Sequence, residues 1–409
     1  MKDIGNTIFV SFGILVASFF SYLLQFYLGR TLSVNDFGMF NALLSVAAIV
    51  GVPASVFGIA LIKEVSALSA KKEDAKVAAI FWQSTIWSIA IGFVVFGFFY
   101  IFRENLLTWF KITNFDVVTA FAFYLSLTFL WSVPYAYFQG LLRYRMFSFF
   151  IAISSFLRFL LPVLFLLKFN RVFNAYLAMA IATVLVTVTA LLLLSKLVGK
   201  TSDLTAWKEL RYILRFSWPV MATNLCLMAF NNNDLILVRS NFTPSESGYY
   251  AGVVTLGKIL LFGSTSVATV MFPKIARLKS GEENTKKHFN DFLKLQVLIL
   301  FAGSLLFVLF PRLIALAFFG TKFLDSVKYL PLYSVFVGLY VILNFLILFL
   351  FAVDITDLYN FLVILVMVQV LLINNFHNSL YQVIYINISV LFVAVSIAML
   401  KSLRFLKKS

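Results

Sequence analysis

The sequence is short of charged residues, cysteine and histidine, and each shortage excludes a class of protein. Only 12% of the 409 residues are charged and 62% are hydrophobic, whereas a soluble domain has about 25% charged and about 45–50% apolar residues. A water-soluble globule and a disordered chain are therefore excluded. The single cysteine, Cys226, excludes a disulfide framework. His288 and His377 are too few and too far apart for a zinc site, so we expect neither a metal nor a cofactor.

Long apolar runs make up most of the chain. Because a transmembrane helix takes about 20 apolar residues, the runs and the polar breaks between them predict about twelve spans. These spans cover roughly 8–28, 37–62, 78–102, 117–138, 147–167, 172–194, 216–238, 248–272, 292–310, 331–352, 359–374 and 382–400. The sequence thus predicts an all-α polytopic membrane protein. The register of the last two spans is the least constrained, because the loop between residues 354 and 360 carries two acids and no base.

The basic residues predict how the chain is oriented. A net charge of +16 would suggest nucleic acid in a soluble protein, but in a membrane protein Lys and Arg gather in cytoplasmic loops. With the N-terminus inside, 22 of the 33 Lys and Arg residues fall in cytoplasmic segments, nine fall outside and two lie within spans. Both termini are therefore predicted to be cytoplasmic, and no nucleic-acid partner is expected. No loop exceeds roughly 25 residues, which leaves no room for a soluble catalytic domain and predicts that the protein is not an enzyme.

The chain repeats itself weakly at an offset of about 210 residues. The segment LGRTLSVNDFGMFNALLSV follows the first span, and VRSNFTPSESGYYAGVVTL follows the seventh. The aligned pairs are Gly38 with Gly248, Phe40 with Tyr250, and Leu68 with Leu278, and each glycine follows an arginine, Arg30 or Arg239. The repeat predicts two six-helix bundles, residues 1–200 and 201–409, related by an axis along the membrane normal. Transporters with such repeats bind substrate at the interface between the bundles.

The repeated segments, with the basic exits IKEVSAL and FPKIARL that follow them, also carry a family resemblance. The chain resembles the polysaccharide-exporter branch of the multidrug/oligosaccharidyl-lipid/polysaccharide superfamily, which contains the Wzx-type flippases. The resemblance extends over the whole chain in span count and is clearest over residues 29–70 and 217–280. Near the C-terminus the chain departs from the pattern, with DITDLYN and NNFHNSLYQ in place of a basic loop and a glycine-rich stretch.

The resemblance implies a function, a location and partners. The cargo would be a polyprenyl-pyrophosphate-linked oligosaccharide repeat unit for O-antigen, capsule or exopolysaccharide synthesis. It would cross the inner membrane of a bacterium to the outer leaflet by alternating access. Glycan polymerases and glycosyltransferases would be partners, and the surrounding membrane lipid would hold the polyprenyl tail.

Cations inside or beside the spans are the candidate substrate-binding residues. Arg158 and Lys258 lie near span centres, where a charge costs at least about 2.5–3.5 kcal/mol and so needs a reason. We predict that they face a water-filled cavity and bind the pyrophosphate, for which a guanidinium is well shaped. A structural ion pair or a snorkelling side chain is the alternative. Arg30 and Arg239, at the outer ends of the first and seventh spans, are further candidates, with anchoring at the headgroups as their alternative.

The seventh span is the most polar and is the candidate for cation coupling. Asn224 and Asn231 lie seven residues apart on one helix face, and Asp234 follows three residues later, close to that face. A carboxylate among amides and carbonyls on a partly unwound helix suits a proton or sodium site, and the choice between these ions stays open. Alternatively, Asp234 pairs with Arg239. Tyr250, beyond this span, is expected in the interfacial aromatic belt.

Other functions share some of these features. A multidrug exporter, or an exporter of another lipid-linked precursor from the same superfamily, is the main alternative. A drug exporter needs acidic residues in the membrane, which Asp234 provides and which Arg158 and Lys258 oppose. A membrane-embedded glycan polymerase or glycosyltransferase would need a long outer loop with acidic or arginine-rich residues, and the loop at 311–330 has only Asp325. A major-facilitator transporter would carry a signature that KEVSALSAKKEDAK lacks. A lipid-linked oligosaccharide flippase is therefore the predicted function.

Overall fold

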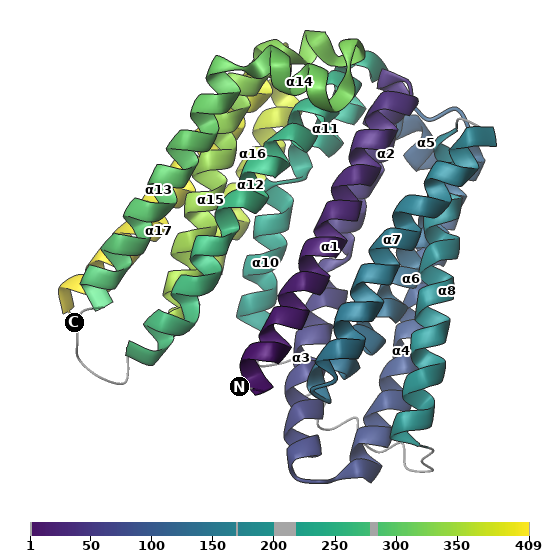
Figure 1. The fold of residues 1–409 in the computed structure, drawn as a ribbon. Helices are drawn as coiled ribbons and strands as arrows, with labels where there is room; N and C mark the ends of the chain where they lie inside the picture. Colours follow the sequence, from purple (N-terminus) through teal and green to yellow (C-terminus); the bar gives the residue numbers. More distant parts are fainter. Residues whose placement is uncertain (1, 169–170, 200–217, 279–284, 409) are drawn as a thin grey trace. The chain divides into compact units, whose positions relative to one another are not determined.

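The structure is a computed structural model that describes residues 2–168, 171–199, 218–278 and 285–408. Over these residues the chain is built of helices and contains no strand (Figure 1). The all-α architecture predicted from the apolar runs is confirmed. The described chain divides into two compact units. The predicted bundle boundary, between residues 200 and 201, lies outside the described residues.

The first unit comprises Met1–Leu32 and Val50–Met221. Its helices are α1 (Lys2–Thr31), α3 (Val52–Ala70), α4 (Asp74–Ile101), α5 (Arg103–Phe110), α6 (Phe115–Gly140), α7 (Tyr144–Lys168) and α8 (Val172–Val198). Helix α6 lies at the centre, against α3, α4 and α8, while α1 packs along α7. Small residues allow this close packing in a membrane. At Gly140 a Cβ atom would come within 2.8 Å of Val65 Cβ, so the crossing of α6 and α3 depends on glycine.

The second unit comprises Ser33–Ile49 and Ala222–Ser409. Its helices are α2 (Val34–Val50), α10 (Trp218–Phe230, whose first turn belongs to the first unit), α11 (Asn233–Asn241), α12 (Pro244–Leu278), α13 (Thr285–Leu309), α14 (Pro311–Phe319), the 3-10 helix η1 (Thr321–Tyr329), α15 (Leu330–Ala352), α16 (Tyr359–Asn375) and α17 (Leu380–Lys408). Helix α15 is apolar along its whole length and lies at the centre, against α12, α13 and α17.

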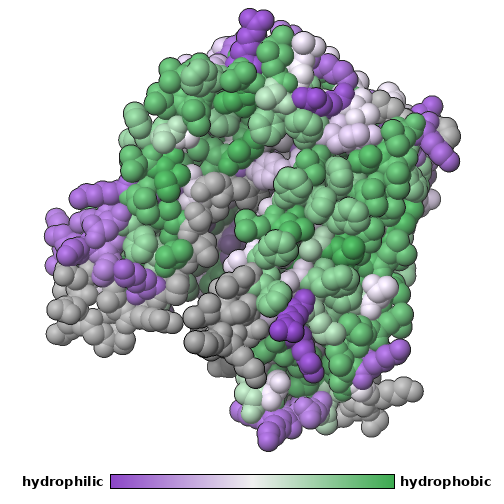
Figure 2. All heavy atoms as spheres, viewed as in Figure 1, coloured by the Kyte–Doolittle hydropathy of each residue, from purple (hydrophilic) through white to green (hydrophobic). Residues whose placement is uncertain are grey.

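Many of the helices are suited to a membrane. By length and composition, nine of the described helices can span a bilayer, and α2, α10 and α16 are shorter apolar helices. Within each unit, hydrophobic side chains cover the helix sides and hydrophilic side chains gather at helix ends (Figure 2). This distribution is what lipid around the helices and water at their ends require. The prediction that both termini are cytoplasmic stays a prediction.

Two spans that the sequence predicts as continuous helices are broken, so those predictions are wrong in detail. The span at 37–62 consists of α2 and α3, because Pro53 in the first turn of α3 has no N–H to continue the helical hydrogen bonds. The described part of the span at 216–238 consists of α10 and α11, separated by a turn at Asn231 and Asn232. Helices α5 and α14 were not predicted and occupy segments expected to be loops.

The structure defines the register of the last two spans, which the sequence left open. Helix α16 matches the span predicted at 359–374, and α17 continues past the predicted end at residue 400 to Lys408. The ammonium of Lys401 lies 2.6 Å from the Asp357 carboxylate, in the loop before α16. The basic end of α17 thus supplies the positive charge that the acidic loop lacks.

Candidate functional site

Asp234 lies in the first turn of α11, directly after the break in the seventh span. Three consecutive asparagines favour this break, since asparagine side chains hydrogen bond to nearby backbone and compete with helix. The side chain of Asn232 does so, donating to the carbonyl of Met228 at 2.8 Å. The partly unwound seventh span that a coupling site needs is therefore present in the structure.

The Asp234 carboxylate is fully buried and is surrounded by hydrogen-bond donors. It accepts hydrogen bonds from the Tyr250 hydroxyl at 2.7 Å, the backbone N–H of Leu235 at 2.7 Å and the Asn387 amide at 3.3 Å. Tyr333 also lies near the same carboxylate, close enough for the two groups to interact electrostatically. A buried carboxylate requires such a shell, because burying a charge without partners is very costly. We call Asp234, Tyr250, Tyr333 and Asn387 the Asp234 cluster.

Lys258 supplies positive charge to this cluster. It lies on α12 two turns after Tyr250, is partly buried, and attracts the Asp234 carboxylate. The ring of Tyr333 lies against the neighbouring Gly257, where an added Cβ atom would come within 2.6 Å of the ring. The structure thus brings together Asp234 and Lys258, which the sequence assigned to cation coupling and to substrate binding respectively.

Sequence reasoning missed most of the cluster and was wrong about Tyr250. The side chain of Tyr250 is fully buried against Asp234 and does not lie in an interfacial belt. Asn387 on α17 is in turn held by the Gln369 amide of α16, which donates to it at 2.9 Å. Asn387 and Gln369 are polar residues within apolar runs of the sequence. Burying a polar group in a membrane is costly, so their positions were a signal that could have identified them.

Of the two asparagines predicted beside Asp234, Asn224 lies before the helix break and Asn231 lies within it, whereas Asp234 follows it. Asn231 is buried in the turn, and its backbone N–H donates to the Leu227 carbonyl at 3.3 Å. Asn224 lies two turns earlier in α10 and is half-buried. Within the described part of the chain, no group of three or more His, Cys, Asp or Glu side chains is placed to hold a metal ion.

Arg158 and Arg30 belong to the first unit. Arg158 is half-buried on α7, and its Nε donates to the Ser154 carbonyl one turn earlier, at 3.3 Å. Pro162, one turn later and inside the same helix, has no N–H to donate to the Arg158 carbonyl. Arg30 is exposed at the end of α1, with its guanidinium 4.4 Å from the centre of the Phe26 ring. The guanidinium of Arg158 is thus bonded through Nε to its own helix.

Arg239 has a different environment from its repeat counterpart Arg30. Its side chain is 1% exposed at the end of α11. Nη1 donates to Asn35 Oδ1 at 2.8 Å and to the Pro244 carbonyl at 3.4 Å, and the Asp36 carboxylate attracts the guanidinium. In this arrangement Arg239 holds two segments of the second unit together.

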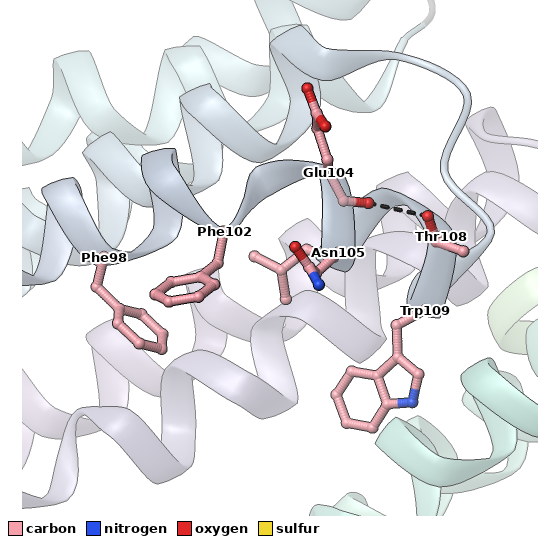
Figure 3. A pocket seen from close by; sticks show the side chains of 7 residues that line it. Phe98, Phe102, Glu104, Asn105, Thr108 and Trp109 are labelled. Carbon is pink, nitrogen blue, oxygen red and sulfur yellow. Dashed lines mark hydrogen bonds between the residues drawn. The ribbon is translucent and has the colours of Figure 1, made fainter.

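A separate hollow of about 720 Å³ lies where α4 meets α5. Figure 3 shows the rings of Phe98, Phe102 and Trp109 beside Glu104, whose carbonyl accepts a hydrogen bond from Thr108 at 3.0 Å. The three rings are 46–54% exposed. None of the predicted site residues lines the hollow. Exposed aromatic rings where a spanning helix ends and a short helix begins are typical of a membrane interface, so we assign the hollow no substrate role.

The sequence of this chain is similar to one known protein family. A sequence model of the family described as polysaccharide biosynthesis protein matches residues 27–328, which is most of the chain. A search of curated proteins finds no match.

Solved structures share the fold over nearly the full chain. An inward-facing multidrug resistance MATE family transporter of the MOP superfamily is similar with a TM-score of 0.79, 13% identity and 99% of each chain covered. The lipid II flippase MurJ is similar with a TM-score of 0.71, 16% identity, and 99% of this chain and 87% of that chain covered. A MOP superfamily transporter from Pyrococcus furiosus is similar with a TM-score of 0.60, 15% identity, and 97% and 94% covered. At these identities the likeness establishes the fold, which confirms the predicted architecture of about twelve spans.

Proposed function

The chain belongs to the polysaccharide biosynthesis protein family, and from this we propose that it is a flippase for a polyprenyl-diphosphate-linked oligosaccharide. The observation that supports this most directly is the combination of that family with a fold shared by a lipid II flippase, whose cargo is also a lipid-linked precursor. The proposed site of action is the cytoplasmic membrane of a bacterium. Glycosyltransferases would supply the cargo, and a glycan polymerase would receive it, for O-antigen, capsule or exopolysaccharide. Transport of this kind needs no catalytic residue, and we propose none.

Arg158 in the first unit and Lys258 in the second are the proposed ligands of the diphosphate. Both are partly buried cations on long helices, Arg158 on the spanning helix α7 and Lys258 on α12, and burial of a charge needs a functional or structural partner to offset its cost. The guanidinium of Arg158 uses Nε for its own helix, and a guanidinium carries four further N–H donors on its two terminal nitrogens. Arg30 and Arg239 stay candidates at the helix ends. Arg239 can reach a ligand only if Asn35 moves away from it.

Replacing Arg158 tests this function and the ligand assignment together. In vesicles that contain a polyprenyl-diphosphate-linked oligosaccharide, we expect the wild-type protein to move the glycan to the opposite leaflet, where an impermeant glycosidase cleaves it. Arg158→Gln removes a charge-assisted hydrogen bond worth about 1.5–3 kcal/mol, so the rate should fall about 10- to 150-fold. Arg103→Gln is the control, because Arg103 lies against the rings of Tyr100 and Phe115 at the start of α5.

The same vesicles separate the rival functions. If wild-type vesicles move the glycan no faster than empty ones, the flippase proposal is wrong. Extrusion of a cationic dye in its place would make the protein a drug exporter. If Arg158→Gln transports at the wild-type rate, the function stands but Arg158 is not a diphosphate ligand.

We propose that a proton, and not sodium, drives transport through Asp234. A sodium ion binds oxygen lone pairs, but the hydrogen-bond partners of Asp234 are the Tyr250 hydroxyl, the Asn387 amide and the Leu235 backbone N–H, which direct hydrogens at the carboxylate. Such a shell accommodates gain and loss of a proton without a new ligand. Asn224 and Asn231 lie on the preceding helix and in the break, where they keep the site polar.

Ion replacement tests this choice. With sodium replaced by choline on both sides of the vesicle, transport should keep its rate, and with the pH gradient dissipated by a protonophore it should slow strongly. Asp234→Asn keeps the shape of the side chain but cannot take up a proton, so its residual transport should not respond to the gradient. A rate that depends on sodium and ignores the protonophore would show that the proton assignment is wrong.

A further inference from the structure

The amide of Asn387 presents its nitrogen to Asp234. Its Nδ2 donates to the Asp234 carboxylate at 3.3 Å and to the Tyr250 hydroxyl oxygen at 3.4 Å. An amide nitrogen carries two hydrogens, so these two contacts use both of them. All three side chains are fully buried. The Asn387 oxygen, which lies at the other end of the same amide, is therefore turned away from the carboxylate.

Gln369 on α16 holds Asn387 in this orientation. The Gln369 Nε2 donates to Asn387 Oδ1 at 2.9 Å, and also to the backbone carbonyl of Phe230 at 3.4 Å, where α10 ends. Because an amide has its acceptor at one end and its donors at the other, a donor on the oxygen of Asn387 directs the nitrogen to Asp234. Helix α16 packs against both α11 and α17, so Gln369 is placed to do this by the packing of the second unit.

The orientation of the Gln369 amide is fixed in its turn. Gln369 is fully buried, and among the described residues its Oε1 has no hydrogen-bond partner. Turning the amide over would bring this oxygen against the Asn387 oxygen and the Phe230 carbonyl, which are both acceptors. A buried acceptor without a partner is costly. The two hydrogen bonds of Nε2 therefore hold the amide one way in spite of the unsatisfied oxygen.

The two oxygens that Gln369 occupies are of the kind that binds sodium. Sodium is held by several oxygens at once, from carboxylates, amides and the carbonyls of unwound helix. Asn387 Oδ1 and the Phe230 carbonyl would supply two of these beside Asp234, but each accepts an N–H of Gln369. A proton needs only the carboxylate itself. A single amide nitrogen thus opposes one ion and leaves the other unaffected, which is how specificity against a competitor arises.

We propose that Gln369 is the residue that makes the Asp234 site select protons and exclude sodium. It does so by keeping the oxygen of Asn387 turned away from Asp234 and by covering the carbonyl of Phe230. This inference rests on the proposed proton coupling through Asp234. Gln369 acts through Asn387, so it is a positioning residue of the coupling site.

Gln369→Met tests the proposal through the binding of sodium to the purified protein. Methionine is unbranched and adaptable in a core but has no N–H, so Asn387 becomes free to turn its oxygen to Asp234. We expect the wild type to unfold at the same temperature in sodium chloride and in choline chloride of equal concentration. Because a bound ion stabilises the folded state, Gln369→Met should unfold about 2–4 °C higher in sodium. Equal unfolding temperatures of this variant in the two salts would overturn the proposal.

A second variant reverses the contact in place of removing it. Gln369→Glu has nearly the same shape, but an ionised carboxylate only accepts hydrogen bonds. The nitrogen of Asn387 should turn to it and the oxygen to Asp234, so this variant should also be stabilised by sodium. It provides the test if Gln369→Met does not fold. In either variant, adding Asp234→Asn should abolish the sodium effect, and an effect that survives this change would contradict the assigned site.

Gln296→Met on α13 is the matched control. Gln296 is also a fully buried glutamine of the second unit, and neither polar atom of its amide has a hydrogen-bond partner within the described part of the chain. The exchange is the same, but the lost amide orients no other group. Its unfolding temperature should not depend on the salt. A sodium effect in Gln296→Met would mean that the exchange itself causes it, and the role given to Gln369 would be wrong.

This measurement is independent of the cargo. If vesicles move no glycan but sodium stabilises the Gln369 variants and not the wild type, the inference about Gln369 stands and the proposed cargo is wrong. If sodium stabilises the wild type as strongly as the variants, sodium already reaches the Asp234 site. The proton assignment and the role of Gln369 are then both wrong.

Discussion

Lys258→Met is expected to abolish glycan transport and to lower thermal stability. Combined with Asp234→Asn, it should regain the thermal stability of the wild type but not its transport. The single change leaves the buried Asp234 carboxylate without its positive neighbour. Because Lys258 is only partly buried, we expect the low end of the range for a broken buried pair, about 3 kcal/mol, or a melting temperature lower by roughly 6–12 °C.

The double variant separates the two roles of Lys258, which are to bind the diphosphate and to neutralise the Asp234 carboxylate. The asparagine that replaces Asp234 is neutral and close to isosteric with aspartate, so no unpaired charge remains and the folded state recovers. Transport should stay more than about 100-fold below wild type, because the diphosphate ligand and the proton site are both lost. Stability is measured by thermal unfolding in detergent and transport by glycosidase access in vesicles.

The matched control for this experiment is Lys274→Met on the same helix. Lys274 is exposed, with its ammonium 5.5 Å from the Phe292 ring, so its loss should change neither quantity much. Recovery of transport in the double variant would mean that Lys258 serves only to neutralise Asp234. The diphosphate would then need another ligand in the second unit.

The sequence was sufficient to predict where the spans lie but not where the helices within them break, and the prolines show why. Apolar runs of about 20 residues have few alternatives to a membrane helix, so the span positions follow directly. Pro134 and Pro162 stand inside continuous helices, whereas Pro53 follows a break. A proline removes one hydrogen bond in every case, and the packing of neighbouring helices decides whether the helix continues.

The site was predictable residue by residue but not as a cluster. Asp234 and Lys258 each stood out because a charge in a span needs a partner, yet 24 positions separate them in the sequence, and only the packing of α11 on α12 shows that they are neighbours. Tyr250 was assigned to the interface because aromatic residues are common in the interfacial belt. Helix α12 begins at Pro244, so Tyr250 lies nearly two turns inside the helix.

The contact between Gly38 and Gly248 was even less visible in the sequence. The repeat aligns Gly38 with Gly248, but an alignment shows equivalence and says nothing about contact. That the two glycines touch each other is a property of tertiary structure. Their absence of side chains acquires its physical meaning only there, since both helices begin at hydroxyl caps, Ser33 and Thr243, that do not require glycine.

Gly248→Val should therefore destabilise the second unit. The new Cβ atom would overlap the Val34 carbonyl oxygen and lie 2.5 Å from Val34 Cγ1. Overpacking of this kind costs about 1–3 kcal/mol. Because a backbone oxygen cannot turn aside as a side chain can, the strain is relieved only by separating α2 from α12. Thermal unfolding in detergent should therefore occur at a lower temperature than in the wild type.

Gly338→Val on α15 is the matched control, since a Cβ atom there would meet nothing within 4 Å. It makes the same exchange inside a helix of the same unit and should leave the unfolding temperature intact. The contrast matters because valine is no worse than glycine for the helix itself, so any difference between the two variants arises at the crossing. If Gly248→Val unfolds at the wild-type temperature, the two helices can separate at little cost and the crossing does not require glycine.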